Sequence, residues 1–372
     1  MLNTILLVAF LAVVLVQLFY YFYILGSFSF AKNKQNPPAL NTKISVLCCF
    51  KNNLEDAKKL IPLLLNQKNV AFELVIIDNN STDDDASITF FEQIEKENTN
   101  VNLVKVENNE AFWGNKKYAL TLGIKAASNE KMAFIEPNYE PANENWLAIL
   151  NNSITPEKQI ILGYTAIKKK KNNLKNKIIR FENLLYHMQM FGYIQRKKPT
   201  FAANTNLAYT KKTYFDNQGF MNHMKIRLGE ADLFVNEAGT KTNTTYTIDA
   251  EARVIRKNYK KYSTWLNDIR KRNYTTRFYN KTEQFTLNLF LINKVLFYTL
   301  LTVLLILQQN LIITCAAALL SIIVSGITIG YSTNKLKEKD LLYWFPFLEI
   351  IIVFITLKIK LKNAFIDQDY WK

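Results

Sequence analysis

Three short polar segments, each directly following an apolar run, carry the residues of this chain that are best suited to bind a ligand. These segments are Phe50-Lys51-Asn52, Asp78-Asn79-Asn80 and Glu136-Pro137-Asn138. In a parallel α/β sheet, ligands bind beyond the carboxyl ends of the strands, where such segments meet. The positive charge of the chain favours phosphorylated ligands, because cationic side chains attract them. We therefore expect a site for a phosphorylated ligand at one edge of a sheet.

The elements that must position these segments follow from the pattern of apolar residues. Short apolar runs predict buried strands, at residues 44–49, 72–77, 101–106 and 131–135. Helical periodicity predicts helices between them, at residues 54–65 and 116–127. Strands that alternate with helices are typical of the α/β class, with a mostly parallel sheet and helices on both faces.

The composition excludes several kinds of protein. Lys and Arg number 47 against 31 Asp and Glu, which gives a net charge of +16. The basic residues are dispersed and form no helix-turn-helix, zinc-finger or RNP-like pattern, so we expect no nucleic-acid partner. Anionic lipid headgroups and phosphorylated substrates account for the charge more simply. Neither the cysteines (Cys48, Cys49 and Cys315) nor the histidines (His187 and His223) have the spacing of a disulfide framework or a metal site.

The apolar run at residues 5–25 is long enough to cross a hydrocarbon core about 30 Å thick. No small-residue cleavage site clearly follows it, which favours a membrane anchor over a cleaved signal peptide. Lys32, Lys34 and Lys43 follow the run, and by the positive-inside rule they place the amino terminus outside and the next domain in the cytoplasm. The expected location is the cell inner membrane, as a multi-pass protein.

The carboxyl-terminal region is also apolar. Runs at residues 287–307 and 311–331 predict a membrane hairpin that returns to the cytoplasm. A third run, 341–361, contains Glu349, Lys358 and Lys360, so it either spans the membrane or lies in the interface with its lysines directed toward headgroups. The predicted divisions are an anchor (1–30), an α/β domain (40–283), a membrane region (284–361) and a tail (362–372).

Five motifs lie along the middle of the chain in a fixed order. They are Ile44-Ser45-Val46-Leu47 with Lys51-Asn52, then residues 75–83, residues 116–124, Asn206-Leu207-Ala208-Tyr209, and residues 229–236. In order and spacing they resemble the inverting family 2 glycosyltransferases with the GT-A fold. The resemblance is to the membrane-embedded bacterial type, related to poly-N-acetylglucosamine synthases and ceramide glucosyltransferases. It covers about residues 44–272, and the flanking apolar segments fit it too.

The resemblance implies catalytic roles for four residues. The Asp-x-Asp motif of the family falls on Glu136-Pro137-Asn138, so Glu136 and Asn138 are the expected ligands of a divalent cation, Mn²⁺ or Mg²⁺. The general base of the family falls in Glu230-Ala231-Asp232, where Glu230 aligns best and Asp232 second. This carboxylate would take the proton from the acceptor hydroxyl during transfer.

The resemblance also implies contacts with a nucleotide-sugar donor. The expected residues are Lys51, Asp78, Asn79, Lys116, Arg270 and Lys271. Arg270 and Lys271 lie in the segment Asp268 to Arg272, which aligns with the Gln-x-x-Arg-Trp motif of the family. Simpler roles stay open: a helix cap for Asp78, a solvated helix face for Lys116, and lipid-phosphate contact for residues 270–272.

Departures from the family pattern leave more than one function open. The metal-binding motif has lost one negative charge, and the glycine-rich segment before Asn206 has become Phe201-Ala202-Ala203-Asn204-Thr205, where the backbone approaches a ligand less closely. We favour an enzyme that transfers a sugar from a nucleotide-sugar donor to a membrane lipid or glycan acceptor. The main alternative is an inactive paralogue that acts as a binding or scaffold subunit with glycan-assembly partners. A third, weaker alternative is another nucleotide-using protein on the same sheet.

Overall fold

The computed structural model describes residues 2–32, 42–83, 85–107, 116–196, 198–257, 259 and 261–365. Its contacts divide the chain into two units, each considered by itself. The α/β unit comprises residues 34–168 and 197–258, and the helical unit comprises residues 1–33, 169–196 and 259–372. Lys34, one of the three lysines after the first apolar run, and residues 366–372 of the predicted tail lie outside the described residues.

The α/β unit contains a seven-stranded sheet in the order β3-β2-β1-β4-β8-β6-β9. Its first four strands are all parallel and match the predicted ones: β1 (Ile44–Phe50), β2 (Phe72–Asp78), β3 (Val101–Lys105) and β4 (Lys131–Phe134). In this register Phe50 lies opposite Asp78, so β1 and β2 end level with each other. The predicted α/β class with a mostly parallel sheet is confirmed.

The other half of the sheet was not predicted. β8 (Leu207–Thr210) runs antiparallel to both β4 and β6 (Ile160–Gly163), and β9 (Thr244–Thr247) is parallel to β6. A separate three-stranded sheet has the order β5-β10-β7, with bounds Tyr139–Pro141, Val254–Arg256 and Thr165–Ile167. The strands of this small sheet have three residues each, too few to show an alternation of apolar and polar residues in a sequence.

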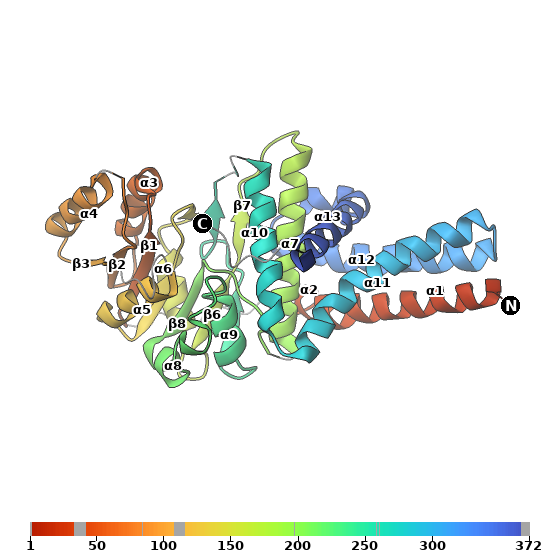
Figure 1. Ribbon diagram of the computed structural model, residues 1–372, viewed down its shortest axis with the longest axis horizontal. Helices are drawn as coiled ribbons and strands as arrows, with labels where there is room; N and C mark the ends of the chain where they lie inside the picture. The colour runs from red at the N-terminus through yellow and green to blue at the C-terminus, as the bar shows by residue number, and fades with distance from the viewer. Residues whose placement is uncertain are drawn as a thin grey trace. The chain divides into compact units, whose positions relative to one another are not determined.

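Helices cover both faces of the large sheet, as predicted. On one face, α3 (Leu54–Leu65), α4 (Ala86–Glu97) and α6 (Trp146–Ser153) pack on alternate β1 residues, Val46, Cys48 and Phe50. On the other face, α5 (Lys116–Ala126) packs so closely that a Cβ on Gly123 would lie 2.2 Å from the Ile77 Cδ1 atom. Figure 1 shows α3 and α4 on one side of β1 to β3 and α5 on the other. Two shorter helices, α8 (Lys211–Asp216) and α9 (Asp232–Ala238), complete this unit.

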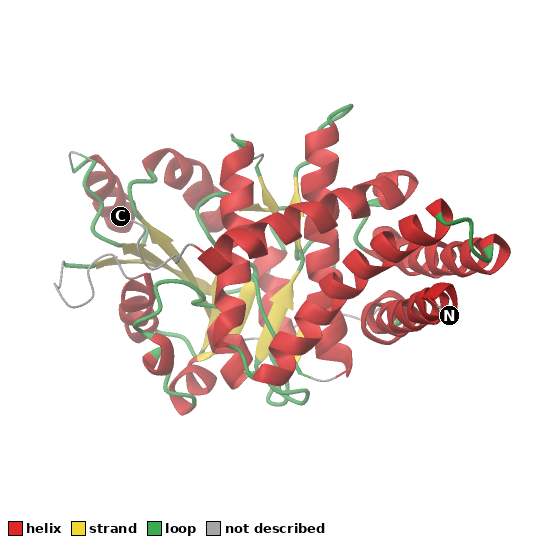
Figure 2. Cartoon of the chain, turned by 45° about the vertical axis from the view of Figure 1, so that its right-hand side comes forward, coloured by secondary structure: helices red, strands yellow, loops and turns green. Residues whose placement is uncertain are grey.

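The described residues of the helical unit form helices (red in Figure 2) and no strands, and these helices are of two kinds, apolar and polar. The apolar ones are α1 (Leu2–Phe19) continued by η1 (Tyr20–Leu25) and α2 (Gly26–Ser29), α11 (Lys281–Ile306), α12 (Leu311–Lys335) and α13 (Phe345–Phe365). In the described chain, four helical segments are long and apolar enough to cross a membrane: Asn3–Ser29, Lys281–Ile306, Leu311–Lys335 and Lys339–Phe365.

Two polar helices, α7 (Leu174–Arg196) and α10 (Tyr262–Thr275), belong to the helical unit although they fall within the predicted domain 40–283. They group with the apolar helices because α7 packs on η1, α2 and α13, and α10 packs on α13. Their polar sequences give no sign of this association. The boundaries of the two units, which follow the contacts between helices, therefore differ from the domain boundaries predicted from hydropathy.

Asn206, in the fourth sequence motif, connects several elements of the α/β unit. Its side-chain amide donates to the carbonyl oxygens of Tyr164 at 2.9 Å and Ala252 at 3.0 Å, and its Oδ1 atom accepts from Trp146 Nε1 at 2.9 Å. Its φ of 55° lies in the left-handed region, which asparagine adopts more readily than most residues. The motif thus has a structural explanation that is independent of any ligand.

We predict that Asn206→Gly lowers the free energy of unfolding by about 3 kcal/mol, because three buried hydrogen bonds worth about 1 kcal/mol each are lost. Glycine tolerates the same φ, so backbone strain does not contribute. The control is Asn69→Gly, at an exposed residue of the same unit with φ of 60°, where we expect a loss below about 1 kcal/mol. Thermal unfolding in detergent measures both, and equal losses would contradict the assignment.

Candidate active site

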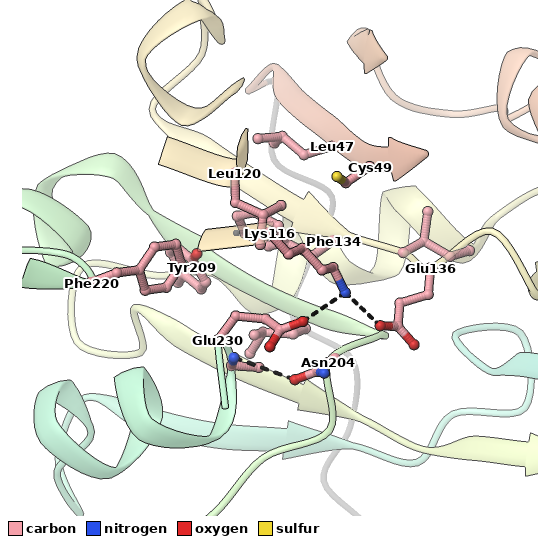
Figure 3. Close-up of a pocket in the computed structure, with 13 residues that line it drawn as sticks. Leu47, Cys49, Lys116, Leu120, Phe134, Glu136, Asn204, Tyr209, Phe220 and Glu230 are labelled. Atoms are coloured by element: carbon pink, nitrogen blue, oxygen red, sulfur yellow. Dashed lines mark hydrogen bonds and ion pairs between the residues drawn. The ribbon is translucent and has the colours of Figure 1, made fainter. Parts of the chain in front are cut away.

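The centre of the candidate site is the ammonium group of Lys116, the first residue of α5. Its Nζ atom lies 2.7 Å from Glu136 Oε1 and 2.7 Å from Glu230 Oε1. Figure 3 shows the two carboxylates converging on this nitrogen from different segments of the chain. Glu136 follows β4, and Glu230 precedes α9. Three of the residues predicted from the sequence therefore lie in direct contact.

Burial and charge act in opposite directions on this cluster. Burial alone would lower the pKa of Lys116, but Glu136 and Glu230 raise it well above its ordinary value. Burial alone would raise the pKa of Glu230, but the ion pair with Lys116 outweighs it and holds the pKa below its ordinary value. Lys116 and Glu230 therefore both stay charged at neutral pH.

The segment just before β8 holds both carboxylate-bearing turns. The backbone N–H of Glu136 donates to Thr205 Oγ1 at 3.2 Å, and the N–H of Ala231 donates to Asn204 Oδ1 at 3.4 Å. In the sequence, this segment stands out only for its missing glycines. In the structure, its polar side chains position Glu136 and Glu230.

Lys117 is a further residue of the site that sequence analysis did not identify. Its side chain is fully buried, and its Nζ atom donates to the carbonyl oxygens of His223 and Ile226, each at 2.8 Å. It therefore ties α5 to the loop that leads to Glu230. Burial lowers the pKa of Lys117 to about 8, against the opposing effect of nearby carboxylates such as Glu230. In the sequence, adjacent lysines at a helix start resemble a solvated face, so no local signal reveals this role.

A small pocket adjoins the cluster. Lys116, Glu136, Glu230 and Asn204 form its polar part, and its apolar part consists of Leu47, Leu120, Phe134, Ile135, Leu207, Tyr209, Phe220 and Ala231. The Cys49 thiol also lines it, and burial raises the pKa of this thiol to about 12, so it stays neutral. The cavity thus presents charged groups at one side of an apolar lining.

Other predicted residues lie at the ends of β1 and β2. Asp78 is buried, and its Oδ1 atom accepts from the Ser81 N–H at 3.2 Å and the Ser81 hydroxyl at 2.5 Å. Asn79 is buried, and its N–H donates to the Phe50 carbonyl oxygen at 2.8 Å. Lys51 is exposed. Asp78 thus stabilises its own turn, and donor contacts of these three residues stay a prediction.

The remaining predicted residues have different surroundings. Asp232 is a buried residue at the start of α9, and Asn138 Oδ1 is buried without a hydrogen-bond partner in the described chain. Arg270 and Lys271 lie on α10 in the helical unit, where Lys271 is exposed and Arg270 Nε donates to Asn363 Oδ1 at 2.9 Å. Among the described residues, no group of three or more His, Cys, Asp or Glu side chains has the arrangement of a metal site.

The buried Lys117 makes a prediction about pH. Its pKa lies at about 8 rather than 10.5, so between these values the unfolded chain binds more protons than the folded chain. The free energy of unfolding should therefore rise with pH in this window, by up to ~1.4 kcal/mol per pH unit. Lys117→Met should remove the rise, whereas Lys125→Met, at an exposed lysine of the same helix, should keep it. Denaturation at several pH values measures the free energy of unfolding. If its dependence on pH were the same in Lys117→Met as in the wild type, the assignment of the rise to Lys117 would be refuted.

The chain was compared with known proteins. Residues 45–222 match the family model of Glycosyl transferase family 2. No curated protein matches the chain in sequence. The mannosyltransferase PcManGT from Pyrobaculum calidifontis, solved in complex with GDP-Man and Mn²⁺, is 12% identical with a TM-score of 0.60, and the match covers 98% of this chain and 99% of that one.

A second solved structure, S. aureus TarS 1–349 in complex with UDP-GlcNAc, is 14% identical with a TM-score of 0.43, covering 82% of this chain and 91% of that one. The likeness to the mannosyltransferase concerns the fold, and the family match concerns the segment that contains Lys116 and Glu136. Residues 45–222 are therefore similar to Glycosyl transferase family 2, within a chain that has the GT-A fold.

Proposed function

We propose that the protein is an active, inverting glycosyltransferase that moves a sugar from a nucleotide-sugar donor to a membrane lipid or glycan acceptor. The observation that carries this proposal is the Lys116 ammonium held at 2.7 Å from both Glu136 and Glu230. This contact supports the proposal, because an ammonium group suits a phosphate and the carboxylate beside it is buried and of the kind that accepts protons. The GDP-Man bound to a mannosyltransferase of similar fold supports a nucleotide-sugar donor.

Binding of the donor would change the electrostatics of the cluster. The donor diphosphate competes with the carboxylates for Lys116, and the amino-terminal end of α5 also favours a phosphate group. When the ammonium moves toward the diphosphate, Glu230 loses part of the charge that lowers its pKa. Its pKa then rises, which makes Glu230 a stronger base in the loaded site than in the free protein.

Glu230 would then accept the proton of the acceptor hydroxyl. The acceptor oxygen forms a bond to the anomeric carbon, while the bond from that carbon to the diphosphate oxygen breaks. The nucleoside diphosphate leaves with the bonding electrons, and attack from the opposite face inverts the anomeric centre. Lys117 keeps the loop that carries Glu230 in place through its two carbonyl contacts.

A divalent cation fits the residues present, with Glu136 and Asn138 as its ligands. Asn138 Oδ1 is a buried oxygen without a hydrogen-bond partner among the described residues, as a ligand awaiting a cation would be. A bound cation would neutralise charge on the donor phosphates. Hard cations are held largely by ligand charge, so a single carboxylate implies weak binding. Mn²⁺ in the mannosyltransferase structure supports this assignment.

The helical unit supports an acceptor located in the membrane. Its four long apolar helices suit a membrane-embedded protein, and a lipid or lipid-borne glycan is the acceptor that such a protein meets. Lys32 and Lys43, which follow the first apolar helix, favour a cytoplasmic glycosyltransferase domain and, in a bacterium, the inner membrane.

We predict that Glu230→Gln lowers turnover by ~10²–10⁴-fold, the usual cost of removing a general base, and leaves donor affinity nearly unchanged. The measurements are nucleoside diphosphate release with a panel of nucleotide sugars, and calorimetric titration of the same donors with and without Mn²⁺. The control is Glu237→Gln, the same substitution at a 37%-exposed carboxylate on α9, which should leave turnover unchanged.

Two outcomes would contradict this proposal in different ways. If the wild type binds no nucleotide sugar at millimolar Mn²⁺ or Mg²⁺, the protein is not an enzyme of this kind, and the binding or scaffold role takes its place. If Glu230→Gln is fully active and Asp232→Asn is inactive, the glycosyltransferase assignment stands and Asp232 is the base.

A further inference from the structure

The helix α13 is apolar and long enough to cross a membrane, but its contacts run in the wrong direction for a membrane span. Glu349, near the start of α13, pairs with Lys294 of α11 at 2.8 Å. Lys360, near its end, donates to the side-chain oxygen of Asn288. The two helices are therefore antiparallel where they touch, since later residues of α13 contact earlier residues of α11.

A third carboxyl-terminal span would require the opposite order. The helix α12 returns through the bilayer after α11, so a following span would run parallel to α11. Later residues of α13 would then face later residues of α11. The pairs at Lys294 and Asn288 show the reverse.

Both ends of α13 also lie against polar helices. At its start, Lys177 of α7 lies over the Trp344 ring, with Nζ 4.0 Å from the ring centroid. At its end, Asn363 accepts from Arg270 Nε at 2.9 Å and donates to the Arg270 carbonyl oxygen at 3.1 Å, and its own carbonyl oxygen accepts from Arg277. Helices as charged as α7 and α10 do not enter a hydrocarbon core, so both ends of α13 lie on one side of it.

One hydrophobic core among the described apolar helices contains no residue of α13. It consists of residues of α1, α11 and α12, namely Phe10, Val14, Phe297, Leu304 and Ala318. Ile306, the last residue of α11, lies ~18 Å of helix beyond Lys294 and ~27 Å beyond Asn288, and the second length is close to the ~30 Å thickness of a hydrocarbon core. Figure 1 shows α1, α11 and α12 extending side by side, with α13 beside α7 and α10, on which it packs.

We propose that α13 is an interfacial helix that docks, together with α7 and α10, on the anionic headgroup layer of the bilayer. Among the described helices, α1, α11 and α12 then cross the membrane, and residue 365 lies on the same side as α7 and α10. The exposed side chains of α13 suit this position, because Phe354 and Phe347 offer apolar surface and Lys358 and Lys362 offer positive charge to lipid phosphates. This inference does not depend on catalytic activity.

Cysteine labelling tests which side of the membrane the end of α13 occupies. In a Cys315→Ser background, Lys362→Cys is compared with two exposed reference sites, Lys337→Cys after α12 and Gln308→Cys between α11 and α12. A membrane-impermeant maleimide is applied to sealed vesicles of either orientation. We expect Lys362→Cys to label together with Lys337→Cys. Labelling together with Gln308→Cys would overturn the proposal, whatever the absolute orientation.

A depth measurement gives an independent answer. Nitroxide labels are placed at Phe354→Cys and at Ile323→Cys, exposed residues near the midpoints of α13 and α12. A spanning α13 would put both midpoints at the bilayer centre. We expect the label at residue 354 to be markedly more accessible to a polar relaxation agent than the label at residue 323, because an interfacial helix enters only the headgroup boundary. Equal protection at both residues would overturn the interfacial assignment.

Discussion

The α/β unit depends on one interaction, the sharing of the Lys116 ammonium between Glu136 and Glu230. Two carboxylates this close repel each other strongly in a partly buried site unless a cation lies between them. The parallel strands deliver Glu136 to the sheet edge, and the Lys117 contacts hold the loop before Glu230 against α5. The surrounding strands and loops thus hold the side chains of Lys116, Glu136 and Glu230 together, whereas in water these groups would separate.

In the described part of the helical unit, buried charges are likewise paired at two places. Lys294 and Glu349 are almost completely buried and bind each other, and Arg180 binds Glu338 in the same way. Their positions along the helices set the direction of α13, because an unpaired charge in an apolar environment is too costly to keep. Ion pairing thus shapes both the candidate catalytic site and the arrangement of the apolar helices.

The sequence was most informative where a local pattern determines structure. The parallel strands and the helices α3 and α5 could be predicted to within a residue or two, since apolar runs end there at polar turns. Lys116, Glu136 and Glu230 were identified through a resemblance. The roles of Lys117 and Asn204 could not be predicted, because each depends on a loop distant in sequence. The same applies to α7 and α10, whose polar sequences do not reveal that they pack on the apolar helices.

The most direct measurement of the central claim is an experimental structure of the protein with a bound nucleotide sugar. We expect donor phosphate oxygens within hydrogen-bond distance of Lys116 Nζ, and the anomeric carbon facing Glu230. The Lys116 ammonium should have moved away from Glu136, Glu230 or both. A donor bound elsewhere, with Lys116 still bridging Glu136 and Glu230, would contradict it.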